Sequence, residues 1–207
     1  MKILTYGDSI TDMGRNRDAT GIYSYGVGYP YIVYSRLCEK EPAKHTLINK
    51  GISGNRIVDL YARIKEDVWN HSPDVLSILI GINDIWHELA RKSGVDIKRF
   101  EKMYRMIIED TKERLPDIKI MLLEPFVLPG TAVDAYGIDA FSQVKEYANV
   151  IKNLAAEYGL TFIPLQEKFD SSAALYGNSY FLYDGVHPDV AGATLIANEW
   201  LDAFYKL

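Results

Sequence analysis

A serine, an aspartate and a histidine stand in this chain where they could carry out nucleophilic catalysis. Ser9 follows Gly7 and Asp8 directly after a short apolar run, and Asp184 precedes His187 by three residues near the other end. A serine hydroxyl is a weak nucleophile, so a base must take its proton and a third group must orient that base. His187 could be the base, with Asp184 accepting a hydrogen bond from its second ring nitrogen. These residue types predict acyl transfer through Ser9.

The oxyanion that forms during acyl transfer needs hydrogen-bond donors. The backbone N–H of Ser9 is one candidate, and that of Gly54 is a second, because a residue without a side chain lets its N–H approach a ligand closely. Asn83 supplies a side-chain amide shortly after the apolar run 74–80. Losing one such donor typically lowers kcat by about 10²- to 10³-fold. Ser9, Gly54 and Asn83 are therefore the predicted oxyanion hole.

The elements that must position these residues follow an alternating α/β pattern. Short apolar or β-branched runs alternate with longer segments of helical period, which is typical of βαβ units and a parallel sheet. The predicted strands are 2–6, 45–49, 74–80, 119–123 and 161–163, and the predicted helices are 30–39, 57–70, 97–115, 140–158 and 188–205. Ligands of an open parallel sheet bind beyond the carboxyl ends of its strands. We therefore expect the predicted catalytic residues to meet at that edge.

The last helix and the long connections add detail to this prediction. Pro188 suits a first helical position, where its missing N–H costs nothing. The helix it would begin carries one apolar face, made of Ala193, Ile196, Ala197, Trp200, Leu201 and Phe204. Residues 12–29, 124–137 and 166–183 are predicted to be irregular loops, and Cys38 is predicted to lie in the core.

Composition limits the class of protein. The 207 residues, 48% hydrophobic and 25% charged, contain no linker or repeat, which predicts a single domain over 1–207 with a substantial core. One cysteine and four histidines predict neither a disulfide nor a zinc site, and we expect no metal or other cofactor. A net charge of −5 without a basic stripe makes nucleic acid an unfavoured partner.

No membrane span is predicted, because no apolar run approaches the ~20 residues that cross a bilayer. The N-terminus also lacks the pattern of a secretory signal, so a cytoplasmic location is predicted. A leader removed beforehand is left open.

Four sequence blocks give the chain a resemblance to a known family. They are Gly7-Asp8-Ser9-Ile10, Gly51-Ile52-Ser53-Gly54-Asn55, Gly81-Ile82-Asn83-Asp84 and Asp184-Gly185-Val186-His187-Pro188. In this order they resemble the blocks of the SGNH hydrolases, also called the GDSL esterases and lipases. Ile10 replaces the more usual leucine, a conservative change. No Gly-x-Ser-x-Gly elbow of the larger α/β-hydrolase fold is present.

The resemblance implies a fold and a set of roles. The fold is a flavodoxin-like three-layer αβα sandwich with a five-stranded parallel sheet, the SGNH hydrolase fold. Ser9 would be the nucleophile, His187 the base and Asp184 its partner, with Gly54 and Asn83 as oxyanion donors. We expect Asp8 and Asp84 to brace loops by accepting backbone N–H groups.

Aromatic residues near these blocks suggest a substrate. Tyr23 and Tyr25 lie in a Gly-rich loop after Ser9, and Trp86 and His87 closely follow Asn83. Aromatic rings with polar tips suit sugars, whose C–H faces are apolar and whose hydroxyls need partners. The block around Asn83 also resembles that of the family's carbohydrate acetylesterases, including xylan deacetylases. The prediction is a serine esterase that removes small acyl groups, above all acetyl, from carbohydrate hydroxyls through an acyl-enzyme on Ser9.

Several alternatives remain open at this point. A broad-specificity acyl esterase, a thioesterase or a lysophospholipase of the same family would use the same residues. From other classes, a metal-dependent phosphoesterase could gather Asp8, Asp12, Asn83, Asp184 and His187 around cations. A non-catalytic carbohydrate-binding domain could keep the pocket without the chemistry. The tyrosine- and tryptophan-containing surfaces could also serve a homo-oligomer interface.

Overall fold

A single parallel sheet organises the molecule. The computed structural model describes residues 1–207, and its five strands lie in the order β2-β1-β3-β4-β5. They are β1 (Lys2–Gly7), β2 (Thr46–Gly51), β3 (Val75–Leu79), β4 (Lys119–Leu123) and β5 (Thr161–Ile163). All neighbouring pairs are parallel. The five predicted strands and their parallel arrangement are confirmed.

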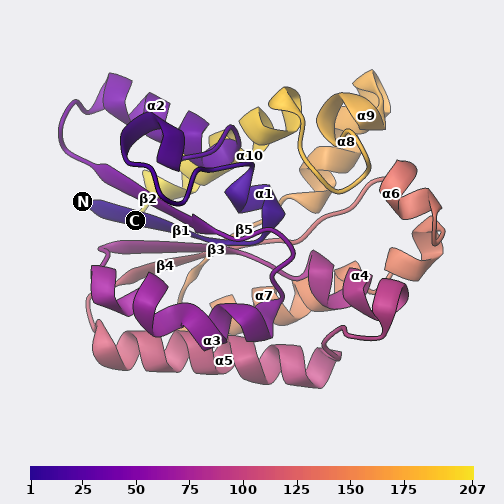
Figure 1. Cartoon of the computed structure of the whole chain (residues 1–207), viewed down its shortest axis with the longest axis horizontal. Coiled ribbons are helices and arrows are strands. Elements are labelled where there is room, and N and C mark those ends of the chain that lie inside the picture. The colour runs from indigo at the N-terminus through magenta and orange to yellow at the C-terminus, as the bar shows by residue number, and fades with distance from the viewer.

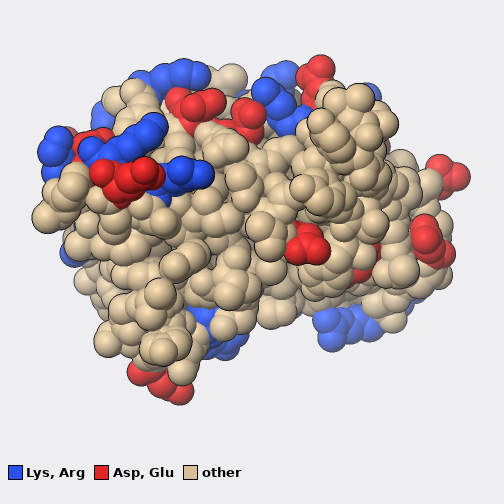
Figure 2. All heavy atoms as spheres, turned by 90° about the horizontal axis from the view of Figure 1, so that it is seen from above, with Lys and Arg blue, Asp and Glu red and all other residues tan.

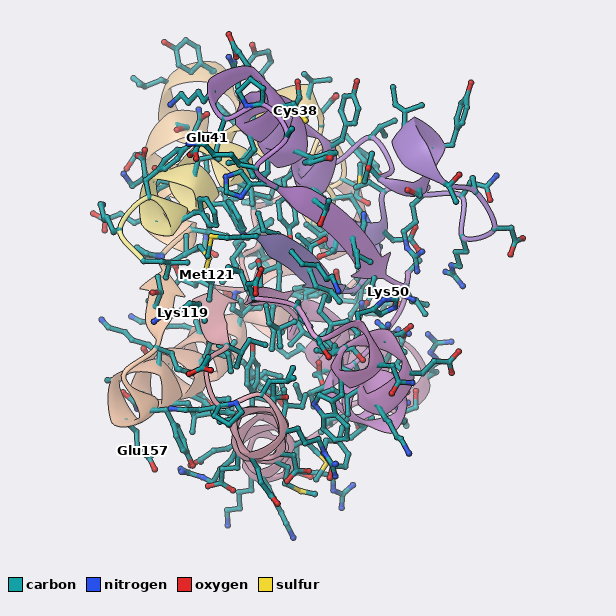
Figure 3. All side chains as sticks on the ribbon, turned by 90° about the vertical axis from the view of Figure 1, so that its left-hand side faces the viewer. Cys38, Glu41, Lys50, Lys119, Met121 and Glu157 are labelled. Carbon is teal, nitrogen blue, oxygen red and sulfur yellow. The ribbon has the colours of Figure 1, made fainter.

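Helices cover both faces of the sheet, because strands buried on both sides need apolar partners above and below. The helices α2 (Tyr29–Lys40) and α10 (Val190–Phe204) pack on one face, and α3 (Ile57–Asp67), α5 (Ile97–Arg114) and α7 (Val144–Tyr158) on the other (Figure 1). Seen from the end, Cys38 of α2 lies in the upper layer, Met121 of β4 in the middle and Glu157 of α7 in the lower layer (Figure 3). The predicted three-layer αβα sandwich is confirmed.

The register of the central strands brings their carboxyl ends level. Gly7 at the end of β1 pairs with Gly51 of β2 on one side and with Leu79 of β3 on the other. A Cβ atom on Gly7 would lie 2.4 Å from the carbonyl oxygen of Leu79, so a larger residue would force the chains apart. Consequently the segments that follow three neighbouring strands leave the sheet side by side.

The apolar face of α10 is buried as predicted, but the helix does not begin at Pro188. It starts at Val190, with Asp189 as its N-cap, while Pro188 forms an isolated antiparallel bridge with Leu182. The backbone N–H groups of Tyr183 and Asp189 donate to carbonyl oxygens on either side of that bridge. Pro188 is therefore part of the turn that carries His187. The prediction that Cys38 lies in the core is also wrong, because Cys38 is exposed.

Two longer helices lie where none was predicted. The helix α4 (Ile82–Arg91) begins directly after the turn that follows β3, and its first turn carries Asn83. Its apolar residues at 82, 85, 86 and 89 have helical spacing, which is the signal that could have revealed it. The predicted loop 166–183 contains α8 (Gln166–Tyr176) and the short α9 (Asn178–Phe181).

The start of α8 depends on a residue far away in the sequence. The carboxylate of Glu124 accepts the N–H groups of Leu165 (2.7 Å) and Gln166 (2.9 Å), which have no acceptor inside the helix. The remaining short elements are α1 (Ser9–Asp12), α6 (Thr131–Asp134) and the 3₁₀ turns η1 (Gly21–Ser24), η2 (Trp69–His71) and η3 (Ile138–Phe141). None of the helices combines the length and the apolar composition that a bilayer crossing requires.

Candidate active site

The turn after β1 presents Ser9 at the start of α1. Asp8 is the N-cap of this one-turn helix, and its Oδ1 atom accepts the N–H of Ile10 at 3.0 Å. The Asp8 side chain is fully buried, whereas Ser9 is partly exposed. The predicted bracing role of Asp8 is confirmed, and its effect is to fix the turn from which the Ser9 hydroxyl projects.

Ser9, His187 and Asp184 form a continuous chain of hydrogen bonds. The Ser9 Oγ atom lies 2.9 Å from His187 Nε2, and His187 Nδ1 lies 2.7 Å from Asp184 Oδ2. The other oxygen of Asp184 accepts the N–H groups of Val186 (2.9 Å) and His187 (2.8 Å). The structure thus brings the predicted nucleophile, base and orienting group together in the order that nucleophilic catalysis requires.

The electrostatics of Asp184 favour its charged form. Partial burial raises the pKa of this carboxyl, but the hydrogen bonds from the backbone and ring of His187 and from the N–H of Val186 outweigh it. The net pKa therefore lies below its usual range. An ionised Asp184 can hold a proton on His187 Nδ1. That tautomer leaves Nε2 free to accept the proton of Ser9.

The turn that carries Asp184 and His187 is held by the loop after β4. Leu128 donates its N–H to the carbonyl oxygen of Gly185 (2.9 Å), and Ala132 donates to that of Asp184 (3.0 Å). Tyr183 closes the turn by donating to the carbonyl oxygen of His187 at 3.0 Å. The loop after the fourth strand therefore positions the predicted base.

The three predicted oxyanion donors lie beyond the level ends of β1, β2 and β3. Ser9 is the first residue of α1, where an N–H has no intrahelical acceptor. Gly54 has a φ of +80°, a conformation that favours glycine, and its N–H makes no hydrogen bond within the protein. Asn83 Nδ2 donates to the carbonyl oxygen of Asn55 at 3.1 Å, and lies 3.4 Å from Asp8 Oδ2. This longer contact is the one that a nearby oxyanion could replace.

Two carboxylates fix the loop that contains Gly54. Both oxygens of Asp84 lie near the N–H of Ile57, at 3.1 and 3.3 Å, and hold the start of α3. Asp12 accepts the N–H of Ser53 at 3.0 Å from the other side. The predicted bracing role of Asp84 is confirmed. The equivalent role of Asp12 was not predicted, because its partner lies 41 residues away.

A hollow of about 390 Å³ opens beside Ser9 and His187. It is lined by Ser9, Asp12, Met13, Gly14, Ser53, Tyr183 and His187. The Tyr183 ring lies nearly parallel to the His187 ring, with centroids 5.8 Å apart and an interplanar angle of 17°. Trp86 also contacts His187, at 6.0 Å between centroids. Tyr183 was missed by sequence reasoning, and its position immediately before Asp184 is the only signal that could have found it.

The other residues predicted to bind substrate do not line this hollow. Tyr23 is 74% exposed on the loop after α1. Tyr25 packs against Tyr34, with ring centroids 5.0 Å apart. His87 lies 2.8 Å from a guanidinium nitrogen of Arg91, and burial, together with the charge of Arg91, lowers the pKa of its imidazole. Their contact with substrate stays a prediction.

Comparison with known proteins identifies the family. The model of the GDSL-like lipase/acylhydrolase family matches residues 5–195. The chain belongs to this family. It is similar to an acetylxylan esterase from Geobacillus stearothermophilus, with 34% identity over an alignment that is 214 residues long. The alignment covers 97% of this chain and 92% of that protein.

Solved structures of similar proteins support this assignment to the family. A putative GDSL-like lipase from Parabacteroides merdae superposes on this chain with a TM-score of 0.93 and 37% identity. The superposition covers 98% of this chain and 94% of the lipase chain. The Geobacillus stearothermophilus acetylxylan esterase gives a TM-score of 0.87 and 33% identity, with 98% and 93% covered. This chain is therefore a GDSL-family carboxylic ester hydrolase with the fold of its relatives, and a Ser-His-Asp triad is consistent with that family.

We expect Asn83→Ala to lower kcat of this GDSL-family esterase by about 10²- to 10³-fold with little change in KM. An oxyanion donor acts mainly when charge develops on the carbonyl oxygen, so its loss affects the chemical step more than substrate binding. Steady-state kinetics with p-nitrophenyl acetate measure this, beside Asn153→Ala on the exposed side of α7 as a matched control. An unchanged kcat in Asn83→Ala would remove this residue from the oxyanion hole.

The buried carboxyl of Asp8 should make stability depend on pH. Burial raises its pKa from 3.8 to about 7. Between about pH 4 and pH 7 the unfolded chain releases this proton while the folded chain keeps it. The free energy of unfolding should therefore fall as the pH rises, by at most about 1.4 kcal/mol per pH unit from this group.

Urea unfolding at pH 4.5 and pH 7 measures this dependence. In Asp8→Asn the free energy of unfolding should fall less between these two pH values. The decrease that remains should come from Asp84, whose pKa is also raised by burial. Asp18→Asn, at an exposed position, is the control. The same fall in Asp8→Asn as in the unmodified protein would show that Asp8 does not titrate in this range.

Proposed function

We propose that this protein is a serine esterase that removes acetyl groups from carbohydrate hydroxyls through an acyl-enzyme on Ser9. The observation that carries the proposal is the 2.9 Å contact between Ser9 Oγ and His187 Nε2, at the end of a hydrogen-bond chain that begins at Asp184. This contact gives the hydroxyl a base at the distance that proton transfer needs.

In the acylation step, Ser9 Oγ attacks the acetyl carbonyl carbon while His187 Nε2 takes the hydroxyl proton. The charge that develops on the carbonyl oxygen is stabilised by the N–H groups of Ser9 and Gly54 and by the side-chain amide of Asn83. Asp184 stabilises the imidazolium that forms. When the tetrahedral intermediate collapses, the bond to the sugar oxygen breaks, and this oxygen takes the proton from His187 and leaves as a hydroxyl.

In the deacylation step, water replaces the sugar. His187 Nε2 takes a proton from this water as its oxygen attacks the acetyl carbonyl of the acyl-enzyme. The same donors stabilise the second oxyanion. Collapse of the intermediate breaks the bond to Ser9 Oγ, which recovers its proton from His187, and acetate is released.

A relative supports the assignment of the three residues. Three solved structures of the Geobacillus stearothermophilus acetylxylan esterase are described as catalytic mutants, in which a serine, an aspartate or a histidine is replaced by alanine. In that protein the aspartate precedes the histidine by three positions, as Asp184 precedes His187 here. The spacing and the residue types agree with the roles proposed for this chain.

The proposed sugar substrate is supported by the relatives and by the surface near Ser9. The matching enzyme is an acetylxylan esterase. The hollow beside Ser9 combines the Tyr183 ring and the Met13 side chain with small and polar residues, and Tyr183 is 54% exposed. An aromatic face beside hydrogen-bonding groups suits a pyranose ring better than an acyl chain.

A substrate panel tests this function. Release of acetate from acetylated xylo-oligosaccharides should exceed, in kcat/KM, the hydrolysis of acyl-CoA thioesters and of lysophospholipids. Preference for a thioester or a lysophospholipid would overturn the sugar assignment and leave the Ser9 mechanism in place. A serine-reactive phosphonate should add covalently to Ser9. Failure to form this adduct, measured by mass spectrometry, would indicate a carbohydrate-binding domain without catalysis.

A further inference from the structure

The reaction steps proposed above make no use of Arg63, a mostly buried arginine of α3. Figure 2 shows other lysine and arginine side chains projecting from the margins of one face of the molecule, where water surrounds their charge. The Arg63 side chain, in contrast, is only 16% exposed. Removing a guanidinium from water costs free energy unless its N–H groups are well paired. The role of Arg63 therefore follows from the groups with which it pairs.

The guanidinium of Arg63 joins the ends of β1 and β2 to the loop after β2. Its Nη2 atom donates to the carbonyl oxygen of Gly7 at the end of β1 (3.2 Å), and Nη1 donates to that of Lys50 in β2 (2.9 Å). The Nε atom donates to Oδ1 of Asn55 in the following loop (2.8 Å). Because the N–H directions of a guanidinium are fixed in one plane, these contacts set the positions of their acceptors relative to one another.

Asn55 connects Arg63 to two of the three predicted oxyanion donors. It directly follows Gly54, whose N–H makes no hydrogen bond within the protein. The carbonyl oxygen of Asn55 accepts a hydrogen bond from the side-chain amide of Asn83 at 3.1 Å. A shift of Asn55 would therefore move both donors. Misplacing a group by about 1 Å can lower the rate of a reaction by about 10²-fold.

The guanidinium is itself held in one orientation. Asp67, one turn after Arg63 on α3, places its Oδ2 atom 2.6 Å from Nη1, and its other oxygen lies 3.0 Å from Lys50 Nζ. The guanidinium carbon lies 4.3 Å from the centre of the Tyr6 ring, within the range of a cation–π contact. Tyr6 is fixed in turn, because its hydroxyl donates to the carbonyl oxygen of Leu60 at 2.6 Å. A side chain held in this way can define the positions of the groups that it binds.

We propose that Arg63 is a positioning residue for the oxyanion hole. Its guanidinium fixes Asn55, and Asn55 in turn fixes the N–H of Gly54 and the side-chain amide of Asn83. This inference rests on the proposed function, because it requires that these donors stabilise the oxyanion of an ester reaction. An arginine with a purely structural role would support the stability of the fold and leave kcat unchanged.

The first test is Arg63→Lys, with p-nitrophenyl acetate as the substrate. A lysine can keep the positive charge and the ion pair with Asp67, but a single ammonium cannot bridge both strand ends and Asn55 at once. We expect kcat to fall by about 10- to 100-fold. KM should change by less than about twofold, because the displaced donors act mainly in the transition state. Thermal melting should show that the variant remains folded.

Asn55→Ala tests the same connection without altering the arginine. Its kcat should also fall, again with little change in KM. In the double variant that carries Arg63→Lys and Asn55→Ala, the loss of kcat should be clearly smaller than the product of the two single losses. Both substitutions break one connection, and residues in one hydrogen-bond network couple in this way. Two independent losses of stability would not produce this coupling in kcat.

Arg105→Lys is the matched control. Arg105 of α5 is also bound by several groups, since its guanidinium donates to Glu101, Glu157 and Tyr158. None of these residues lines the hollow beside Ser9. Its kcat should therefore match that of the unmodified protein, even if its melting temperature falls.

The outcomes separate this inference from the proposed function. An unchanged kcat in Arg63→Lys or in Asn55→Ala, or losses that multiply in the double variant, would overturn the positioning role. An equal fall of kcat in Arg105→Lys would overturn it too, because the effect would then be a general one. Should Arg63→Lys not fold, the kcat of Asn55→Ala decides alone. If the unmodified protein does not hydrolyse p-nitrophenyl acetate, the proposed function fails instead.

Discussion

Ser9→Ala is expected to lower kcat for p-nitrophenyl acetate by about 10⁴- to 10⁶-fold while the protein stays folded. The substitution removes one oxygen atom, whose only hydrogen-bond partner is His187 Nε2 at 2.9 Å. No covalent acyl-enzyme can then form. The turn itself should persist, because it is held by the Asp8 side chain and not by the Ser9 hydroxyl. Initial rates, circular dichroism and thermal melting measure the two parts of this expectation.

A matched control separates the loss of the nucleophile from a general effect of removing a hydroxyl. Ser171→Ala, at an exposed position on α8, should keep both the activity and the melting temperature. A serine-reactive phosphonate should label Ser171→Ala and fail to label Ser9→Ala. Substantial turnover by folded Ser9→Ala would show that another group attacks the ester.

Asp184→Asn should lower kcat by about 10⁴-fold, because the substitution reverses the tautomer of His187. The Asn oxygen can still accept the N–H groups of Val186 and His187, which places the amide nitrogen toward His187 Nδ1. An amide nitrogen donates and does not accept, so Nδ1 must become the acceptor and Nε2 must carry the proton. His187 then cannot accept the proton of Ser9. No backbone carbonyl contacts Nδ1 and preserves the original tautomer.

Kinetics with p-nitrophenyl acetate and the rate of phosphonate labelling both measure this loss. Asp134→Asn on α6 is the control, since Asp134 is exposed and lies near the segment that holds the Asp184 turn. Thermal melting should show that Asp184→Asn remains folded. A loss of less than about tenfold would mean that the orientation of His187 does not depend on the Asp184 carboxylate.

Local sequence was sufficient for the strands and insufficient for some helix boundaries. The strands β3 and β4 are nearly continuous apolar runs because both of their faces are buried, and such runs are visible in the sequence. In contrast, α8 starts where Glu124 accepts two of its N–H groups across 41 and 42 residues. Pro188 was assigned to α10 from its local preference, but its bridge to Leu182 holds it in the preceding turn.

The sequence by itself determined which chemical groups this protein can use. Residue types and local spacing make Ser9 a candidate nucleophile and place Asp184 within reach of His187, because three residues of turn bring the two side chains together. The order of the four sequence blocks also identified Gly54 and Asn83 as candidate hydrogen-bond donors to the oxyanion.

Only the tertiary structure decided that these groups meet. The contact between Ser9 and His187 joins residues 178 positions apart. It depends on the level carboxyl ends of β1, β2 and β3 and on the loop after β4, and both are set by pairing between distant strands and segments. The same holds for Tyr183 beside His187 and for the loop braced by Asp12 and Asp84. Interactions between distant residues depend on how the chain packs, so they cannot be predicted from the spacing of residues along the sequence.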